Sequence, residues 1–414
     1  MYKKLTWVVL LVSLVFVTGC SRFAADASHA SSATFLPVQL SAPEVDAAEP
    51  VTATAPGGGF YVAWVNHVGH HQADVMLGRF DNEGMAAGSA VRVNPQAGDA
   101  TAWRGDPPSV AVTDRAVYVL WTARIEVDGK KGTDLYLSAS EDQGKTFATT
   151  VKVNDDKLPG AHGMHSLAVA RDGRIYVAWL DERNIQVPKP SKHAGGHHME
   201  SNRELFVASS VDGGKTFSKN RQVAADACPC CKTALAVSAD GTIYASWRQV
   251  LPGNFRHIAV AKSSDGAANF SAPVIVSDDK WMLQGCPVSG PSLSTDPSGA
   301  LKVVWYAAGE AGAPGLYFAE TRDQGRTFSP RALLMQEPVK GTPALVAGPN
   351  RTVAVWQGGQ QIETKMRELG GAGTAVSVAA NAELPSGALC NNKLFVAYIT
   401  KVGEKRSVWL AKVG

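Results

Sequence analysis

The 414-residue sequence lacks a strong charge of either sign, because 40 Lys and Arg residues face 37 Asp and Glu residues. It also lacks a basic stripe interleaved with aromatic residues, the pattern that nucleic-acid-binding proteins present. These two absences predict that the chain has no nucleic-acid partner. A long apolar run is missing as well: the segment from Trp7 to Val17 is shorter than the ~20 residues of a transmembrane helix.

That short apolar run belongs instead to a segment laid out as a secretory signal peptide. Lys3-Lys4 supply its positive start. Its end, Val17–Cys20, resembles the lipobox of bacterial lipoproteins, which implies a lipidated Cys20, and Ser21 resembles the outer-membrane sorting residue. We therefore expect a signal peptide at 1–20 and an outer-membrane lipoprotein that faces the periplasm or the surface. An ordinary secretory signal with a chance cysteine is the alternative.

The rest of the chain divides by composition. Residues 21–33 are rich in Ala and Ser and predict a flexible tether. The remaining 34–414 are long enough for one large domain with its own core. We expect that domain to be a monomer, anchored to the membrane only through its lipid.

A short motif recurs within this domain, each time after an alternating apolar stretch. Its best copy is Ser209–Phe217, with close copies at Ser140–Phe147 and Thr321–Phe328 and a decayed copy at Ser264–Phe270. The Asp can hydrogen-bond the turn backbone, and Gly can adopt positive φ. The motif therefore predicts a β-hairpin turn.

These turns resemble the Asp-box, or BNR repeat, of the sialidase superfamily. The resemblance implies an all-β β-propeller. It does not by itself imply sialidase chemistry, because one fold hosts many functions. The segment from Leu167 to Phe328 is also similar to bacterial Asp-box proteins labelled sialidase-like, in which C-P-C-C and G-C-P segments precede consecutive blades.

The repeat can be counted by its second strands, most of which end in Trp. These are Phe60–Trp64, Val117–Trp121, Ile175–Trp179, Ile243–Trp247, Leu301–Trp305, Thr352–Trp356 and Leu394–Tyr398. Third strands follow at Asp74–Leu77, Asp134–Leu137, Glu204–Val207, His257–Val260, Gly315–Phe318, Ile362–Lys365 and Ser407–Leu410. The count predicts a seven-bladed β-propeller, with a six-bladed sialidase-like propeller as the alternative, and interblade packing for the aromatic residues.

The last blade lacks an outer strand of its own. Thr34–Ser41 near the start resembles the outer strand expected at Phe270–Ser277. We therefore predict that an N-terminal strand closes the ring, which pairs the two open edges.

Propeller geometry places the connectors between blades and the loops between second and third strands on one face, called here the top face. Five cysteines remain besides Cys20, and an oxidising compartment favours disulfides. We expect Cys286 to pair with one of Cys228, Cys230 or Cys231. The Cys228-x-x-Cys231 spacing also matches redox pairs, although no thioredoxin-like pattern accompanies it.

The same face collects side chains that could bind a metal, either copper or zinc, since thiolates and imidazoles suit both ions. The candidates are His67, His70, His71, His162, His165, His197, His198, Cys228, Cys230, Cys231 and Cys286. A solvated histidine-rich loop without metal is the alternative.

The resemblance to sialidases also implies a set of site residues: three arginines that bind the substrate carboxylate, a Tyr nucleophile activated by a Glu, and an Asp that acts as acid and base. Candidates for substrate binding are Arg104, Arg183, Arg203, Arg248 and Arg256, and candidates for catalysis are Asp106, Tyr306 and Glu310. The Arg-Ile-Pro segment that starts sialidase domains is absent, and ion pairs that brace long loops are the alternative for these arginines.

These patterns favour a binding function over catalysis. We expect the top face to bind a metal ion, an anionic glycan or an envelope protein partner. The alternatives are an exo-α-sialidase or related glycoside hydrolase acting on acidic sugars, and a scaffold that docks periplasmic partners.

Overall fold

The computed structural model describes residues 36–101, 105–157, 159–185, 201–371 and 373–413. The expected signal peptide, Cys20 and tether lie outside these residues, as do Arg104, His197 and His198. Within the described residues, no helix has the length and apolar character needed to cross a membrane.

The described chain is built from antiparallel β-strands. In chain order they are β1 (Val38–Gln39), β2 (Asp46–Thr54), β3 (Phe60–Gly69), β4 (Gln72–Phe80), β5 (Val91–Arg92), β6 (Ser109–Val112), β7 (Val117–Val127), β8 (Lys130–Ser140), β9 (Thr149–Lys152), β10 (His162–Val169), β11 (Ile175–Asp181), β12 (Arg203–Ser210), β13 (Arg221–Ala227), β14 (Ala234–Val237), β15 (Ile243–Leu251), β16 (Phe255–Ser263), β17 (Val274–Ile275), β18 (Ser292–Thr295), β19 (Leu301–Ala307), β20 (Gly315–Thr321), β21 (Ala332–Met335), β22 (Val339–Ala347), β23 (Thr352–Gly358), β24 (Glu363–Glu368), β25 (Val376–Ala380), β26 (Glu383–Cys390), β27 (Lys393–Val402) and β28 (Lys405–Val413).

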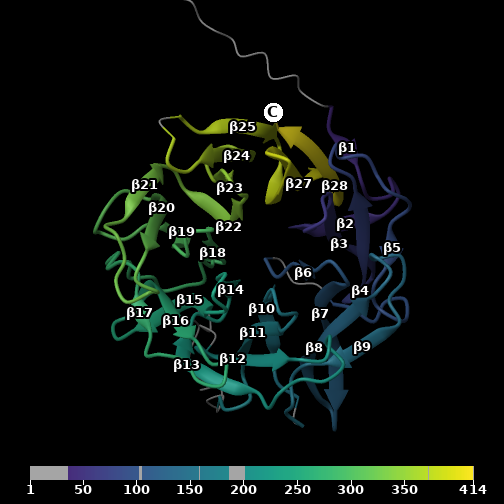
Figure 1. The fold of residues 1–414 in the computed structure, drawn as a ribbon, viewed down its shortest axis with the longest axis horizontal. Coiled ribbons are helices and arrows are strands. Elements are labelled where there is room, and N and C mark those ends of the chain that lie inside the picture. The colour runs from purple at the N-terminus through teal and green to yellow at the C-terminus, as the bar shows by residue number, and fades with distance from the viewer. Residues whose placement is uncertain (1–35, 102–104, 158, 186–200, 372, 414) are drawn as a thin grey trace, which may run out of the picture. The chain divides into compact units, whose positions relative to one another are not determined.

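Consecutive strands pair in groups of four, and the groups are arranged around a common centre (Figure 1). Each group runs from an inner strand such as β2 to an outer strand such as β5. The second strands expected from the repeat coincide with the starts of β3, β7, β11, β15, β19, β23 and β27. The alternating apolar pattern therefore located the strands well.

Two pairings go beyond simple four-stranded groups. β1 pairs antiparallel with β28, with Val38 opposite Leu410, so a strand from the start of the domain lies against its last strand. Ala227 at the end of β13 pairs with Gln249 of β15, which joins two groups into one larger sheet. This second pairing holds the following segment, Cys228–Cys231, close to β15.

The recurring tryptophans lie in the core, as expected for packing residues. Trp179, Trp247, Trp305 and Trp356 are fully buried between adjacent sheets. Each indole N–H still has an acceptor; that of Trp305, for example, donates to Asp279 at 2.8 Å. The repeat thus places a large apolar side chain with a satisfied polar atom in each interface.

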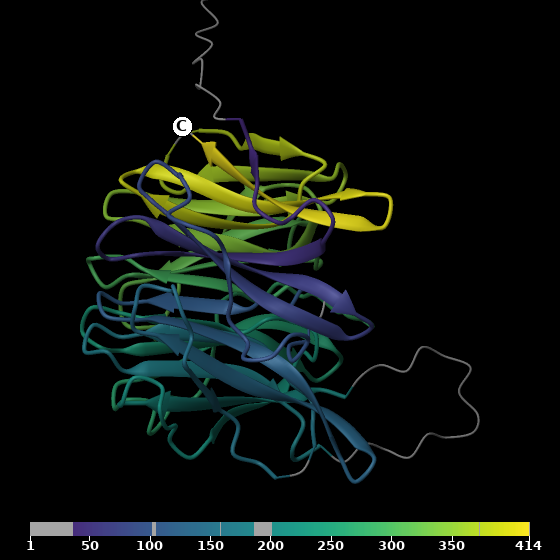
Figure 2. The ribbon, with the colours of Figure 1, turned by 90° about the vertical axis from the view of Figure 1, so that its right-hand side faces the viewer.

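The Asp-box turns lie at the strand ends opposite the β3–β4 hairpin. Asp212 accepts hydrogen bonds from the backbone N–H groups of Lys215 and Thr216, each at 3.0 Å, and from the Thr216 hydroxyl. These bonds, led by the Thr216 hydroxyl, lower the pKa of Asp212 to about 2. In the Asp-box turn of Ser140–Phe147, the Gln143 carbonyl accepts a hydrogen bond from the hydroxyl of Tyr61, which lies at the start of β3. The hairpins β3–β4, β7–β8 and β27–β28, in contrast, project from one common side of the molecule (Figure 2). Asp212 is therefore a brace of its turn.

Candidate functional site

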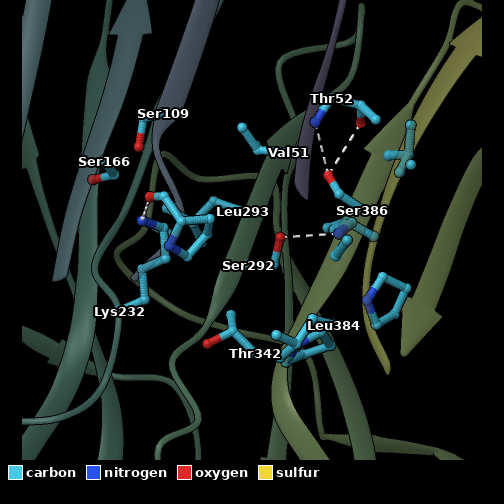
Figure 3. Close-up of a pocket in the computed structure, with 18 of the residues that line it drawn as sticks. Val51, Thr52, Ser109, Ser166, Lys232, Ser292, Leu293, Thr342, Leu384 and Ser386 are labelled. Atoms are coloured by element: carbon cyan, nitrogen blue, oxygen red, sulfur yellow. Dashed lines mark hydrogen bonds between the residues drawn. The ribbon is translucent and has the colours of Figure 1, made fainter. Parts of the chain in front are cut away.

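A central cavity of about 270 Å³ is lined by the inner strands and the segments that precede them. Figure 3 shows Ser109, Ser166 and Lys232 on one side of it, with Thr52 and Ser386 across from them. Small hydroxyl side chains dominate the polar lining, namely Thr52, Ser109, Ser166, Thr233, Ser292, Thr342 and Ser386. Among the described lining residues, Glu49 and Lys232 carry ionisable side chains.

The backbone of the inner strand β2 is irregular beside this cavity. The pairing register shifts between Ala48 and Val51 in β2, and Glu49 within that bulge has a positive φ of 54°. The next residue is Pro50, which cannot donate to a ladder and suits a bulge. Bulges re-aim side chains. Here the bulge places Glu49, which is only 3% exposed, at the edge of the cavity.

A buried ionic cluster formed by Glu49, Asp106, His165 and Lys232 lies at the start of these strands. Asp106 accepts a hydrogen bond from the Met164 N–H at 2.8 Å, and Lys232 Nζ lies 3.4 Å from its Oδ1. His165 Nε2 lies 3.9 Å from the same oxygen. Burial opposes the ionisation of Asp106, but the charges of its neighbours outweigh it and lower its pKa. Asp106 is thus the ionised member of the cluster.

The pKa of Glu49 is shifted in the opposite direction to that of Asp106. Its Oε2 accepts one hydrogen bond, from the Gly105 N–H at 3.2 Å. Burial raises the pKa of Glu49 to about 7, and the nearby charge of Asp106 adds to the shift. The two carboxyl groups therefore differ in protonation near neutral pH, so the cluster offers both a proton donor and an anion.

Of the three expected catalytic residues, the structure places only Asp106 in this cluster. Tyr306 lies on β19, where its ring packs edge-on against Trp281 at 5.4 Å. Glu310 is exposed beyond that strand, with its N–H donating to the Lys280 carbonyl. The three side chains are held by different neighbours, so the expected arrangement of nucleophile, activator and acid is not assembled.

The candidate arginines are engaged elsewhere. Arg183 pairs with Asp155, Asp156 and Asp181 at 2.6–3.6 Å, and Arg203 pairs with Glu182 at 2.7 Å. These contacts match the alternative in which arginines brace long loops.

Arg248 and Arg256 are 0% and 3% exposed. Arg248 donates to the carbonyls of Ser289 and Tyr306. Neither side chain lines the central cavity. The described arginines thus do not form a three-arginine clamp there.

The histidines separate into different environments. His67 and His71 belong to the β3–β4 hairpin, where His70 contacts His71 at 3.9 Å between ring centroids. His165 Nδ1 lies 3.0 Å from the Ser109 hydroxyl, and burial lowers the pKa of His165 to about 3, so the ring is neutral.

His162 lies in a group with Asp134 and Asp156 whose ligand atoms are close enough to hold a metal ion. Burial disfavours its charged form, but the carboxylates of Asp156 and Asp181 outweigh burial and raise its pKa to about 10. Lys152 already pairs with Asp134, and Arg183 pairs with Asp156. The group therefore behaves as a buried ion-pair network.

The cysteines do converge. Cys230 forms a disulfide with Cys286, one of the three pairings that the sequence left open. Cys228 Sγ lies 3.0 Å from Cys231 Sγ and 3.9 Å from Cys230 Sγ. Among the described residues, the groups that could hold a metal contain either these cysteines or Asp134, Asp156 and His162, so no such group mixes Cys with His.

The Cys228 and Cys231 thiols are also electrostatically distinct. The hydrogen bond from Cys231 lowers the pKa of Cys228 to about 6, with help from the charges of Arg248 and Arg256 and against the effect of burial. Burial raises the pKa of Cys231. Cys228 is therefore the thiolate of the pair.

Sequence reasoning missed Glu49 and Lys232. Glu49 interrupts an apolar stretch and precedes Pro50, which is a signal for a bulge that carries a buried acid. Lys232 directly follows Cys231, and its local sequence gives no signal of a buried ion pair with a distant residue. Glu49 lies in the bulge of the inner strand β2, and Lys232 lies just before the inner strand β14. The inner strands are the part of a propeller where the blades come together.

The chain matches no protein-family model and no curated protein sequence. It is similar to the solved structure of a Dyadobacter fermentans protein of unknown function, with 12% identity, 92% of this chain and 98% of that chain covered, and a TM-score of 0.52. It is also similar to the α-L-arabinanase of Penicillium chrysogenum complexed with arabinobiose, with 14% identity, 76% and 94% covered, and a TM-score of 0.52.

A third similar structure is a mutant of Trypanosoma rangeli sialidase that displays trans-sialidase activity. The identity is 13%, the TM-score is 0.46, and the match covers 74% of this chain and 53% of that one, about half of its length. The first two likenesses show the fold alone. The protein has an all-β propeller fold of the kind found in glycoside hydrolases.

Proposed function

We propose that the protein is an outer-membrane lipoprotein whose seven-bladed propeller binds an acidic sugar in its central cavity. The groups of four paired strands support the blade count, and the pairing of β1 with β28 supports closure of the ring by an N-terminal strand. The lipobox-like Val17–Cys20 supports the anchor.

The observation that carries the proposed ligand is the presence of both Lys232 and Glu49 on a cavity wall of small hydroxyls. Lys232 can donate to a carboxylate, and Glu49, with its raised pKa, can donate a second hydrogen bond below pH 7. Ser and Thr hydroxyls both donate and accept, which suits the hydroxyl groups of a sugar ring. A cavity of this size suits a single sugar unit.

Calorimetric titration with N-acetylneuraminic, glucuronic and galacturonic acids tests this function. We expect Lys232→Met to weaken binding of the preferred acid at least tenfold, because the substitution removes the charged donor. Lys145→Met in an exposed Asp-box turn is the matched control and should bind normally. Failure of all three acids to bind at millimolar concentration, or equal affinities in both variants, would contradict the proposal.

A second candidate is glycoside hydrolysis, and it rests on the different protonation of Glu49 and Asp106. Glycosidases use one protonated and one ionised carboxyl group, and such a difference marks an acid/base pair. An exo-α-sialidase would also need arginines at the cavity, which the described arginines do not supply. Assays with fluorogenic sialosides and arabinosides decide the matter: turnover that falls more than a hundredfold in Glu49→Gln would establish the enzyme.

The remaining expectations stay predictions. Copper or zinc bound by the histidine and cysteine loops can be tested by elemental analysis of the purified protein. Docking of an envelope protein on the same face can be tested by cross-linking in intact cells.

A further inference from the structure

Four cysteines form a compact cluster, called here the cysteine centre: Cys228, Cys230, Cys231 and Cys286. Cys228 and Cys231 are each 1% exposed, whereas Cys286 is exposed on the segment before β18. Cys228 Sγ contacts both a free thiol at 3.0 Å and a disulfide sulfur, that of Cys230, at 3.9 Å. A dithiol and a disulfide therefore lie in contact, with one sulfur reaching the surface.

Two buried arginines act on this cluster. Arg248 and Arg256 are almost fully buried, and Arg248 Nη1 together with Arg256 Nε and Nη1 have no hydrogen-bond partner among the described residues. The Arg248 carbonyl accepts from the Cys228 N–H at 2.8 Å, and both guanidinium charges stabilise an anion at Cys228 Sγ. A buried cation without a counter-ion is costly. A thiolate at Cys228 supplies that counter-ion, and the thiolate is the reactive form of cysteine.

We propose that the cysteine centre is a thiol–disulfide exchange site, which transfers its disulfide between the surface pair Cys230–Cys286 and the buried pair Cys228–Cys231. The Cys228 thiolate attacks Cys230 Sγ. The Cys228–Cys230 bond forms, the Cys230–Cys286 bond breaks, and its electron pair leaves on Cys286, which takes a proton from solvent.

In the second step Cys231 loses its proton to solvent and attacks Cys228 Sγ. The Cys228–Cys231 bond forms and the Cys228–Cys230 bond breaks, which leaves Cys230 as a thiolate. Cys228 and Cys231 are oxidised, and Cys230 and Cys286 are reduced. The exchange needs no external oxidant, and the protons and electrons balance.

The product of the exchange is a thiol at the surface. Cys286 then lies on an exposed segment, free to attack the disulfide of a small molecule or of another protein, while the electrons come from the buried pair. Opening of Cys230–Cys286 also releases the two connectors that flank the group β14–β17. The site therefore couples redox state to the freedom of the top-face loops, independently of any ligand in the central cavity.

Alkylation of the full-length protein tests the exchange. The protein that carries the Cys230–Cys286 disulfide and free Cys228 and Cys231 is kept without oxygen and without added reductant, and iodoacetamide is added at pH 7. In the wild type we expect Cys286 to be alkylated and peptide mapping to find a Cys228–Cys231 disulfide. In Cys228→Ser, Cys286 should be alkylated at least tenfold more slowly, because no thiolate attacks Cys230. Cys390→Ser, which removes a distant buried thiol, should behave as the wild type.

A second variant separates loss of exchange from loss of folding. Cys231→Ser keeps the first step and blocks the second, so we expect a trapped Cys228–Cys230 disulfide together with alkylated Cys286. Equal alkylation of Cys286 in the wild type and in Cys228→Ser would overturn the proposal. A permanent Cys230–Cys286 disulfide in the wild type, or no Cys228–Cys230 bond in Cys231→Ser, would do the same.

Discussion

Lys232 Nζ lies 3.4 Å from Asp106 Oδ1, although the two residues are 126 positions apart in the chain. The same amine donates to the Pro107 carbonyl at 3.1 Å. Both partners are nearly excluded from solvent, with side chains 14% and 1% exposed. The ion pair therefore ties the segment before β14 to the segment before β6 at the edge of the central cavity.

Removal of one partner of this pair should destabilise the fold. Lys232→Met leaves the Asp106 charge buried without its cation, and we expect a loss of about 3 kcal/mol in the free energy of unfolding. The double variant Lys232→Met/Asp106→Asn should recover part of that loss, because no charge is then left unpaired. Urea denaturation of the wild type, Lys232→Met, Asp106→Asn and the double variant measures both effects; additive losses would show that the two groups do not interact.

Glu49 should make stability depend on pH. Its pKa is about 7 in the folded protein against an ordinary value of 4.5, so the folded state keeps a proton that the unfolded chain has lost. Its contribution is fully present below pH 4.5 and is lost as pH rises through 7, and it corresponds to about 3 kcal/mol. We expect the wild type to lose about that much relative to Glu49→Gln between pH 4.5 and pH 8. Urea titrations at several pH values test this, and parallel profiles would contradict it.

The Cys230–Cys286 disulfide should stabilise the domain. It closes a sequence separation of 56 residues, for which the chain-entropy model gives about 4 kcal/mol. Cys286→Ser should therefore lower the free energy of unfolding by roughly that amount, and the wild type in excess reductant should lose the same. Unchanged unfolding in both samples would show that the bond does not constrain the unfolded chain.

The recurring tryptophans should matter for packing rather than for ligand binding. Trp305 is fully buried and donates to Asp279, so Trp305→Ala should cost about 3–5 kcal/mol. Leu333→Ala is a control at an exposed apolar position of β21 in the same sheet and should cost less than about 0.5 kcal/mol. Calorimetric unfolding compares them. A stable Trp305→Ala protein that has lost acidic-sugar binding would instead assign Trp305 to the ligand site.

Local patterns predicted the strands and turns correctly. The segment Ile243–Trp247, which ends in one of the recurring tryptophans, lies in β15, and Asp212 braces its own turn as expected. Such features depend on neighbours within a few positions, so the sequence contains nearly all the information that they require. Local sequence could not show which of Cys228, Cys230 and Cys231 forms the disulfide with Cys286. That choice depends on how two connectors that are far apart in the chain pack against each other.

Long-range packing decided the candidate site. Arg183 has the positive charge that binding of an acidic substrate requires, but it forms ion pairs with Asp155, Asp156 and Asp181. The spacing of residues in the local sequence does not reveal these ion pairs. Glu49 belongs to no motif, and its raised pKa comes from burial that only the assembled sheets produce.

By itself, then, the sequence determined the all-β repeat, the Asp-box turns and the pool of reactive side chains, since these follow from residue type and periodicity. Only the tertiary structure decided which of those side chains meet: Lys232 with Asp106 at the cavity, and Cys228 with Cys231 beside two buried arginines. The physical reason is that electrostatic and sulfur contacts act over a few ångströms, and segments far apart in the chain come that close only when the sheets pack around a common centre.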